Sequence, residues 1–287
     1  MIEDFFNVIE MYPLMGYIFV FLFSAIIGSF LNVVIYRYPI MIQYEYAEII
    51  KENATNLSKE VLEVLEKGKN MSFSLPSSHC FNCKENIKWY NNIPLLSYII
   101  LGGKCFNCKV SYSARYFFVE LFHVIAWLFL FYVFGMSINF IVYSIAFSLL
   151  LSMSMIDLDH KILPDGLVFS LYALGLISST FDNSLISPNQ AIINSIIGFI
   201  ICHSFILIYS KIRGKLMMGF GDIKLIAAIL TFIPIINVVY GLFIGSILGI
   251  LYFVACKLLN KLDEDQYIAF GPFICLGFFS QLVMLGI

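Results

Sequence analysis

The stretch LMGYIFVFLFSAIIGSFLNVVIY, residues 14–36, contains no charged side chain and is long enough to cross a membrane as one helix. A bilayer core of about 30 Å takes roughly 20 apolar residues in an α-helix. The rest of the chain has the same character, since 60% of its 287 residues are hydrophobic and only 13% are charged. This composition excludes an ordinary soluble domain and predicts an all-α membrane protein.

Further apolar runs follow the first, so the sequence predicts a polytopic protein with about eight transmembrane helices. The run that ends at Pro234 is the weakest of them because it is short. Besides 14–36, the expected spans are about 116–134, 139–156, 163–180, 190–210, 223–236, 238–256 and 267–287.

The distribution of positive charge predicts how these helices are oriented. If Met1 lies outside and the helices alternate, the outer segments contain none of the seventeen Lys and Arg residues. Ten of them lie between Arg37 and Arg115, and the others lie in loops or at helix ends on that same side. Because positive loops stay cytoplasmic, we expect 37–115 to be cytosolic. The acidic N-terminus, which lacks Lys and Arg, also argues against a cleaved signal peptide.

We therefore expect three parts, namely a first membrane helix (1–36), a cytosolic domain (37–115) and a membrane-embedded domain (116–287). The cytosolic part begins with LSKEVLEVLEKG, residues 57–68, whose apolar residues recur at helical spacing opposite a charged face. This pattern predicts an amphipathic helix that lies on the membrane or on the rest of the domain, with Gly68 as its stop.

Two copies of the tetrapeptide CFNC, at 80–83 and 105–108, provide two closely spaced pairs of cysteines. Four thiolates in this arrangement suit one tetrahedral zinc ion in a zinc-ribbon-like domain. The alternatives are four unrelated thiols or a redox pair, but a reducing cytosol disfavours permanent disulfides. The zinc ligands are expected to be Cys80, Cys83, Cys105 and Cys108, whereas Cys202, Cys256 and Cys275 are expected to be small core residues.

Two carboxylates are expected at the cytosolic ends of different membrane helices. The predicted third helix ends in SMIDLDHKILPD (154–165), and the predicted sixth begins after MGFGDIK (218–224). In the expected topology, Asp157 and Asp222 therefore lie at the same depth in the membrane. Because a carboxylate in a membrane helix is costly, both residues are candidates for a functional site. Asp159 and Asp165 are more simply explained as residues at helix ends.

Such a pair of aspartates has the chemistry of an aspartic protease. Two carboxyl groups held close together share one proton, so the ionised one can deprotonate water while the protonated one polarises the scissile carbonyl and protonates the leaving amine. Gly219 and Gly221 would let a substrate backbone approach Asp222. The rival interpretations are a zinc-ribbon membrane scaffold whose aspartates only cap helices, and a presenilin-like protease that cuts ordinary transmembrane helices.

The sequence resembles the bacterial type IV prepilin leader peptidases, which are bifunctional peptidase/N-methyltransferases. The resemblance covers nearly the whole chain, and its motifs occur in the family's order. They are GSFLNVVIYRYP (28–39), IKWYNNIPLLSYIILGGKC (87–105), ARYFFVELF (114–122), IDLDHKILPD (156–165) and MGFGDIKLIAA (218–228). A departure occurs before the third cysteine, where Gly102 and Gly103 leave Lys104 as the only basic residue.

The resemblance implies a GxGD-type aspartic protease of the bacterial inner membrane. It would remove the basic leader of prepilins and related pseudopilins after a glycine, at the cytosolic face, and methylate the new N-terminus with S-adenosylmethionine. Membrane lipid is the other expected partner, and nucleic acid is not expected. The motifs map onto Asp157 and Asp222 as catalytic residues, onto the four zinc-binding cysteines, and onto Asp159, Gly219, Gly221 and Lys224 as supporting residues.

The residues that bind S-adenosylmethionine cannot be derived from the sequence. No glycine-rich strand–helix motif is visible, which argues against a Rossmann-type cofactor fold. Glu120 and Arg115 are candidates for the methyltransferase site, although an ion pair at a helix end explains them equally well.

Overall fold

The structure is a computed structural model that describes residues 12–53, 57–214, 219–259 and 268–286. The regular elements of these ranges are helices, apart from two isolated β-bridges in the cysteine domain, so the all-α prediction is confirmed. The described residues form two compact units, 12–128 and 129–286, each of which is considered by itself.

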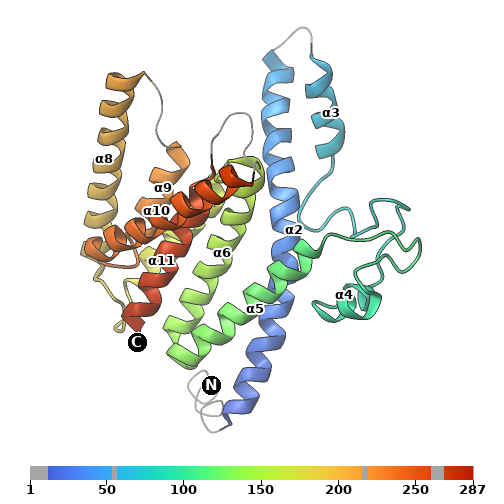
Figure 1. Ribbon diagram of the computed structural model, residues 1–287, viewed down its shortest axis with the longest axis horizontal. Coiled ribbons are helices and arrows are strands. Elements are labelled where there is room, and N and C mark those ends of the chain that lie inside the picture. The colour runs from blue at the N-terminus through green and yellow to red at the C-terminus, as the bar shows by residue number, and fades with distance from the viewer. Residues whose placement is uncertain (1–11, 54–56, 215–218, 260–267, 287) are drawn as a thin grey trace. The chain divides into compact units, whose positions relative to one another are not determined.

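The first unit is built along helix α2 (Pro13–Asn53), which is 41 residues long (Figure 1). It contains the apolar run 14–36 but continues far beyond it, through Pro39, into the segment expected to be cytosolic. The sequence thus locates the membrane-compatible stretch correctly but not the end of the helix. One continuous helix therefore joins the apolar run to the polar domain that follows.

Helix α3 (Lys59–Gly68) lies alongside the C-terminal part of α2, which confirms the predicted amphipathic helix and places it on the rest of the domain (Figure 1). Ser58 caps the helix by accepting a hydrogen bond from the backbone N–H of Val61. The helix ends at Gly68, as expected, and the glycine has a second role in packing. A Cβ atom on Gly68 would lie 2.5 Å from the Cβ atom of Tyr44, so the glycine permits close contact between the two helices.

A buried arginine ties the start of the cysteine domain to α2. The Arg37 guanidinium is only 8% exposed, and it donates hydrogen bonds to the carbonyl oxygens of Ser72 (2.8 Å) and Pro76 (2.6 Å). Charged donors make the stronger kind of protein hydrogen bond, so this contact fixes the chain that enters the first cysteine pair. The remaining elements of the unit are η1 (Trp89–Asn92), α4 (Leu96–Leu101) and most of α5 (Ala114–Phe134).

The second unit begins at Phe129, within α5, and contains six further helices (Figure 1). Each of the eight expected spans contains one helix, but only α2, α5, α6, α8 and α10 are long and apolar enough to cross a membrane. The number eight is therefore not reached by the described residues. The helices of this unit are α6 (Ile138–His160), α7 (Asp165–Ser178), α8 (Pro188–Arg213), α9 (Phe220–Ile229), α10 (Ile235–Leu258) and α11 (Gly271–Gly286).

The short helix α9 is the most buried element of this unit. It contacts α7, α8 and α11, and the side chains of Leu225 and Ala228 are fully buried. It ends at Ile229, and a new helix starts after Pro234, which is why the run 223–236 does not form one span. The burial holds a helix of only ten residues in place, although such a helix would be marginal alone.

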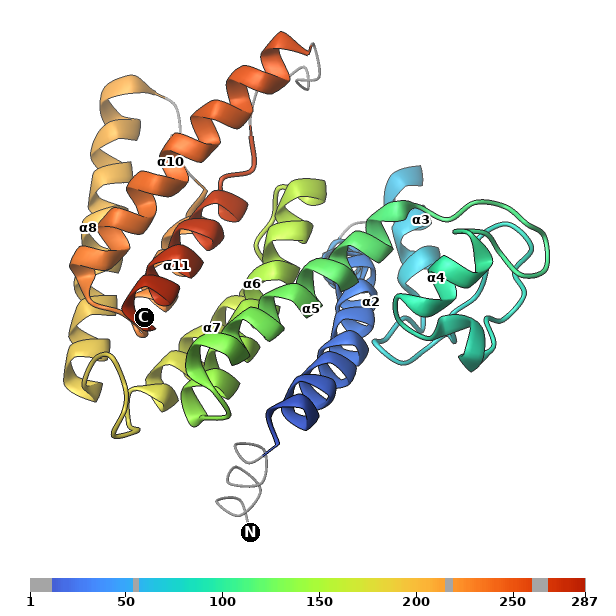
Figure 2. The same cartoon turned by 60° about the horizontal axis from the view of Figure 1, so that its bottom comes forward.

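Helices α10 and α11 lie side by side and antiparallel (Figure 2). A glycine stripe on α10 makes this close approach possible. A Cβ atom on Gly241 would lie 3.0 Å from the carbonyl oxygen of Gly277, and one on Gly245 would clash with the carbonyl oxygen of Phe273. Small residues at such spacing let helix backbones pack in direct contact, as they do in membrane helix pairs.

Candidate functional site

The structure brings the two predicted aspartates together within the second unit. Asp157 lies near the C-terminal end of α6 and is 5% exposed, while Asp222 lies in the first turn of α9 and is 8% exposed. The two carboxylates are close enough to interact electrostatically. Buried carboxylates are costly unless they are paired or hydrogen-bonded, so this arrangement requires partners.

The start of α9 positions Asp222. Gly219 is the N-cap residue, and the Asp222 side chain turns back toward it at the positive end of the helix dipole. Gly219 is exposed, and within the part of the chain that the structure describes only the Asp222 carboxylate lies within 4 Å of the position of its missing side chain. Gly221 instead faces Leu163, because an added Cβ atom would lie 3.0 Å from the Cβ atom of that residue. One glycine thus leaves open space beside the carboxylate, and the other serves packing.

Asp157 is held by a residue that the sequence reasoning missed. The backbone N–H of Gly271, the first residue of α11, donates a hydrogen bond of 2.9 Å to Asp157 Oδ2. A Cβ atom on Gly271 would lie 2.6 Å from that same oxygen, so no side chain fits there. The available signal is the Gly–Pro pair at 271–272, since proline favours the first turn of a helix.

The third helix at this site contributes a thiol as well. Cys275, one turn after Gly271, is 5% exposed and contacts Ser154. Its thiol is also close enough to Asp157 and Asp222 to interact with them electrostatically. The prediction of a small buried residue is confirmed for Cys275, but its closeness to the carboxylates is new. Cys202 and Cys256 are only half-buried.

The supporting residues occupy the exposed edge of the same region. Lys224 forms an ion pair of 2.7 Å with Asp165, which joins the second turn of α9 to the first turn of α7. Asp165 therefore lies at a helix start, as expected, and also has a cationic partner. Asp159 is exposed, whereas Asp157, two residues earlier, is buried. Helical periodicity places these two carboxylates on different faces of α6.

The four cysteines of the CFNC pairs form one cluster in the first unit. Their sulfur atoms all lie within 4.8 Å of one another, and the Cys80 and Cys108 sulfurs are 3.7 Å apart. A tetrahedral zinc with bonds of about 2.3 Å to sulfur needs its ligand sulfurs about 3.8 Å apart. The cluster therefore has the geometry of a four-thiolate metal site.

The repeated tetrapeptide forms two equivalent loops, which we call the first knuckle (80–85) and the second knuckle (105–110). In each, the backbone N–H of the first cysteine donates to the carbonyl oxygen five residues later, at distances of 2.9 and 2.8 Å. Each also has a left-handed lysine after its second cysteine, Lys84 with φ 59° and Lys109 with φ 58°. The same sequence thus makes the same turn twice, with its thiols directed at a common point.

Backbone hydrogen bonds prepare the first thiol of each knuckle for metal binding. The N–H of Cys108 lowers the pKa of Cys105 to about 6, with further hydrogen bonds from Tyr112. In the first knuckle, the N–H of Cys83 likewise lowers the pKa of Cys80 below its ordinary value. The thiolate is the form that binds a metal, so these contacts favour the ligating state of Cys80 and Cys105.

Glu120, a candidate for the methyltransferase site, makes structural contacts. It accepts hydrogen bonds from the backbone N–H of Leu95 (2.9 Å) and from Asn32 Nδ2 (3.3 Å). Leu95 has a positive φ of 60°, which is strained for a residue with a side chain. The half-buried carboxylate thus joins α5 to α2 and stabilises the turn that starts α4.

The chain matches known proteins along most of its length. Residues 22–134 match the model of the bacterial peptidase A24 N-terminal domain, and residues 144–254 match that of the type IV leader peptidase family. The chain belongs to the type IV leader peptidase family. The part matched by the leader peptidase model contains both buried aspartates, and the N-terminal match contains the four cysteines.

Curated relatives in this family align over almost all of the chain. A prepilin leader peptidase/N-methyltransferase of Legionella pneumophila is 35% identical, covering 93% of this chain and 90% of its own. A type 4 prepilin-like proteins leader peptide-processing enzyme of Escherichia coli O78:H11 is 34% identical, with 95% of both chains covered. A prepilin leader peptidase/N-methyltransferase of Stutzerimonas stutzeri is 32% identical. No solved structure matches this chain significantly.

Proposed function

We propose that this leader peptidase family member cleaves the basic leader from type IV prepilins and related pseudopilins after a glycine, and then N-methylates the new N-terminal residue. The names of its full-length relatives support both activities. The observation that carries the peptidase assignment is the buried pair of Asp157 and Asp222 on separate helices of the region matched by the leader peptidase model.

The pair would act as one catalytic unit. One carboxylate takes a proton from the attacking water, while the other, protonated, polarises the scissile carbonyl and then protonates the leaving amine. The Gly271 N–H gives Asp157 Oδ2 a fixed position, which leaves its second oxygen for the water or the shared proton. Exposed Gly219 provides open space for a substrate backbone beside Asp222.

The membrane arrangement is part of this proposal. We place a membrane helix in 1–36, a cytosolic zinc-binding domain in 37–115 and a membrane-embedded peptidase domain in 116–287. The N-terminus lies outside the bacterial inner membrane, and the chain crosses about eight times. The absence of Lys and Arg from the outer segments supports this orientation. The short helices α7 and α11 would cross as parts of the packed bundle, and the sixth crossing would need α9 together with the chain that continues to Pro234.

The methyltransferase activity gives the cysteine cluster a purpose. Zinc is the metal that four thiolates at these distances suit best, and it would hold the two knuckles together. S-adenosylmethionine, the methyl donor of such enzymes, supplies an electrophilic methyl group when bound. The chain's own task is then to bind that donor and the amine of the cleaved pilin at close quarters.

Asparagine variants test the peptidase assignment. A prepilin is incubated with membranes that contain the wild type or one variant, and the leader and the N-terminal methyl group are followed by mass spectrometry. Asp157→Asn and Asp222→Asn should each abolish cleavage, and the double variant should be scarcely worse, because the two act together. Asp159→Asn is the matched control on α6 and should retain cleavage. Normal cleavage by Asp222→Asn would refute the aspartic-protease assignment.

A further inference from the structure

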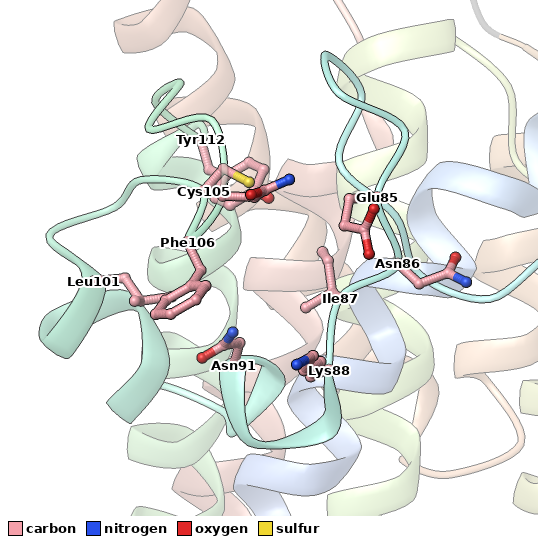
Figure 3. A pocket seen from close by; sticks show the side chains of 10 residues that line it. Glu85, Asn86, Ile87, Lys88, Asn91, Leu101, Cys105, Phe106 and Tyr112 are labelled. Carbon is pink, nitrogen blue, oxygen red and sulfur yellow. The ribbon is translucent and has the colours of Figure 1, made fainter.

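The cysteine domain contains a cavity of about 320 Å³ beside the metal cluster (Figure 3). Phe106, from the second knuckle, lies on one side of it, and Glu85 and Lys88, which follow the first cysteine pair, lie on the other. Asn91 lies at the lower end of the view, and Leu101 of α4 lies beyond Phe106. This volume is in the usual range for small-molecule sites, which combine apolar walls with a few polar groups.

Cys105 and Tyr112 belong to both the metal site and the cavity, but the metal site does not account for the side chain of Glu85. Glu85 and Val110 occupy equivalent positions in the two knuckles, and each accepts the same hydrogen bond with its backbone carbonyl. A knuckle can therefore form with either glutamate or valine at this position. The glutamate, Glu85, occurs in the knuckle where this position lines the cavity. Phe106 also lines the cavity and is 58% exposed, so its ring is accessible to a ligand there.

We propose that this cavity is the S-adenosylmethionine site, an inference that rests on the methyltransferase function proposed above. S-adenosylmethionine combines a flat adenine ring, a ribose diol and a zwitterionic amino acid. The Phe106 ring provides a stacking face for adenine, and the Glu85 carboxylate accepts hydrogen bonds from the diol. The Lys88 ammonium pairs with the ligand's carboxylate, and the Asn91 amide offers both a donor and an acceptor.

The same groups fit the competing ligand, the free amine of a cleaved pilin, less well. An N-terminal ammonium needs a carboxylate such as Glu85, but it has no use for the Lys88 ammonium beside it, which repels like charge. A zwitterion uses both charges at once. The opposite charges on one wall, facing an aromatic ring, thus favour the cofactor over the peptide end.

The repeated tetrapeptide provides a matched control for the test. Phe81 is the counterpart of Phe106 in the first knuckle and is equally exposed, at 60%, but it does not line the cavity. The full-length protein is purified in detergent with zinc, and binding of radiolabelled S-adenosylmethionine is measured by equilibrium dialysis. Zinc per chain is measured for each variant, so a disrupted knuckle is recognised directly.

Phe106→Ala and Glu85→Gln should each raise the Kd about tenfold, from lost stacking and lost charge-assisted hydrogen bonds respectively. Phe81→Ala should stay within about twofold of the wild type. Wild-type affinity in both cavity variants, or an equal loss in Phe81→Ala, would overturn the proposal. If Phe106→Ala and Glu85→Gln weaken the binding of a peptide with a free N-terminal phenylalanine but leave the binding of S-adenosylmethionine unchanged, the cavity holds the peptide end and the proposal is overturned as well.

The wild type separates this inference from the function on which it rests. If it methylates cleaved pilin and binds S-adenosylmethionine, but the cavity variants bind equally well, the cofactor site lies elsewhere and the function stands. If it neither binds the cofactor nor methylates cleaved pilin, the methyltransferase function fails and the cavity assignment fails with it.

Discussion

Replacing Gly271 with alanine should damage the peptidase without touching either aspartate. The new Cβ atom would lie 2.6 Å from Asp157 Oδ2, while ordinary contact begins at 3.4 Å. The carboxylate or the start of α11 must therefore move by about 0.8 Å, which also lengthens or breaks the hydrogen bond from the Gly271 N–H. Misplacing a catalytic group by about 1 Å costs on the order of a hundredfold in rate.

We accordingly expect Gly271→Ala to reduce prepilin cleavage roughly 30- to 100-fold. The assay is the rate of leader release in membranes at matched protein levels. Gly249→Ala on α10 is the control, since its Cβ atom would lie 3.5 Å from the nearest atom, in ordinary contact with the Phe273 ring. Methylation of a pilin that is already cleaved should be unchanged in both. If Gly271→Ala cleaves like the control, Asp157 is not held in a reactive position by this contact.

Two further predictions concern the metal and the topology. Replacing both Cys80 and Cys83 with serine should reduce zinc from about one per chain to nearly none and should impair methylation more than cleavage; unchanged metal content would exclude these ligands. A reporter active only outside the membrane should be active when inserted within 182–189 and silent near Lys69. The reverse activities would invert the orientation and move the peptidase site to the outer face.

The sequence predicts the site well where a chemical requirement leaves a local pattern. The CFNC repeat is sufficient to predict the cluster of four cysteines, because metal binding demands particular side chains at fixed spacing. Asp157 and Asp222 are recognisable because charge is rare in apolar helices and each has a motif around it. The topology predicts only that they lie at the same depth, and the structure adds that they are close enough to interact.

What the sequence does not predict are contacts made by the backbone across long distances. Gly271 acts through its N–H and through the side chain it lacks, so the Gly–Pro pair at 271–272 indicates the start of a helix but not the contact with Asp157. The end of α2 is unpredictable for a related reason. Helical hydrogen bonds continue from lipid into water without a change of pattern, so hydropathy marks the edge of the apolar run and not the end of the helix.

The glycine contact between α10 and α11 fixes the position of α11, and with it the backbone N–H that binds Asp157. Gly277 lies six residues after Gly271, about 9 Å along the same rigid helix. Its backbone meets that of Gly241, with no side chain between them to absorb a displacement. A side chain introduced at this crossing would tilt α11 about the point of contact. The tilt would displace the Gly271 N–H, which donates a hydrogen bond to Asp157. The position of the Asp157 carboxylate thus depends on a helix crossing at which two glycines, Gly241 and Gly277, are in backbone contact.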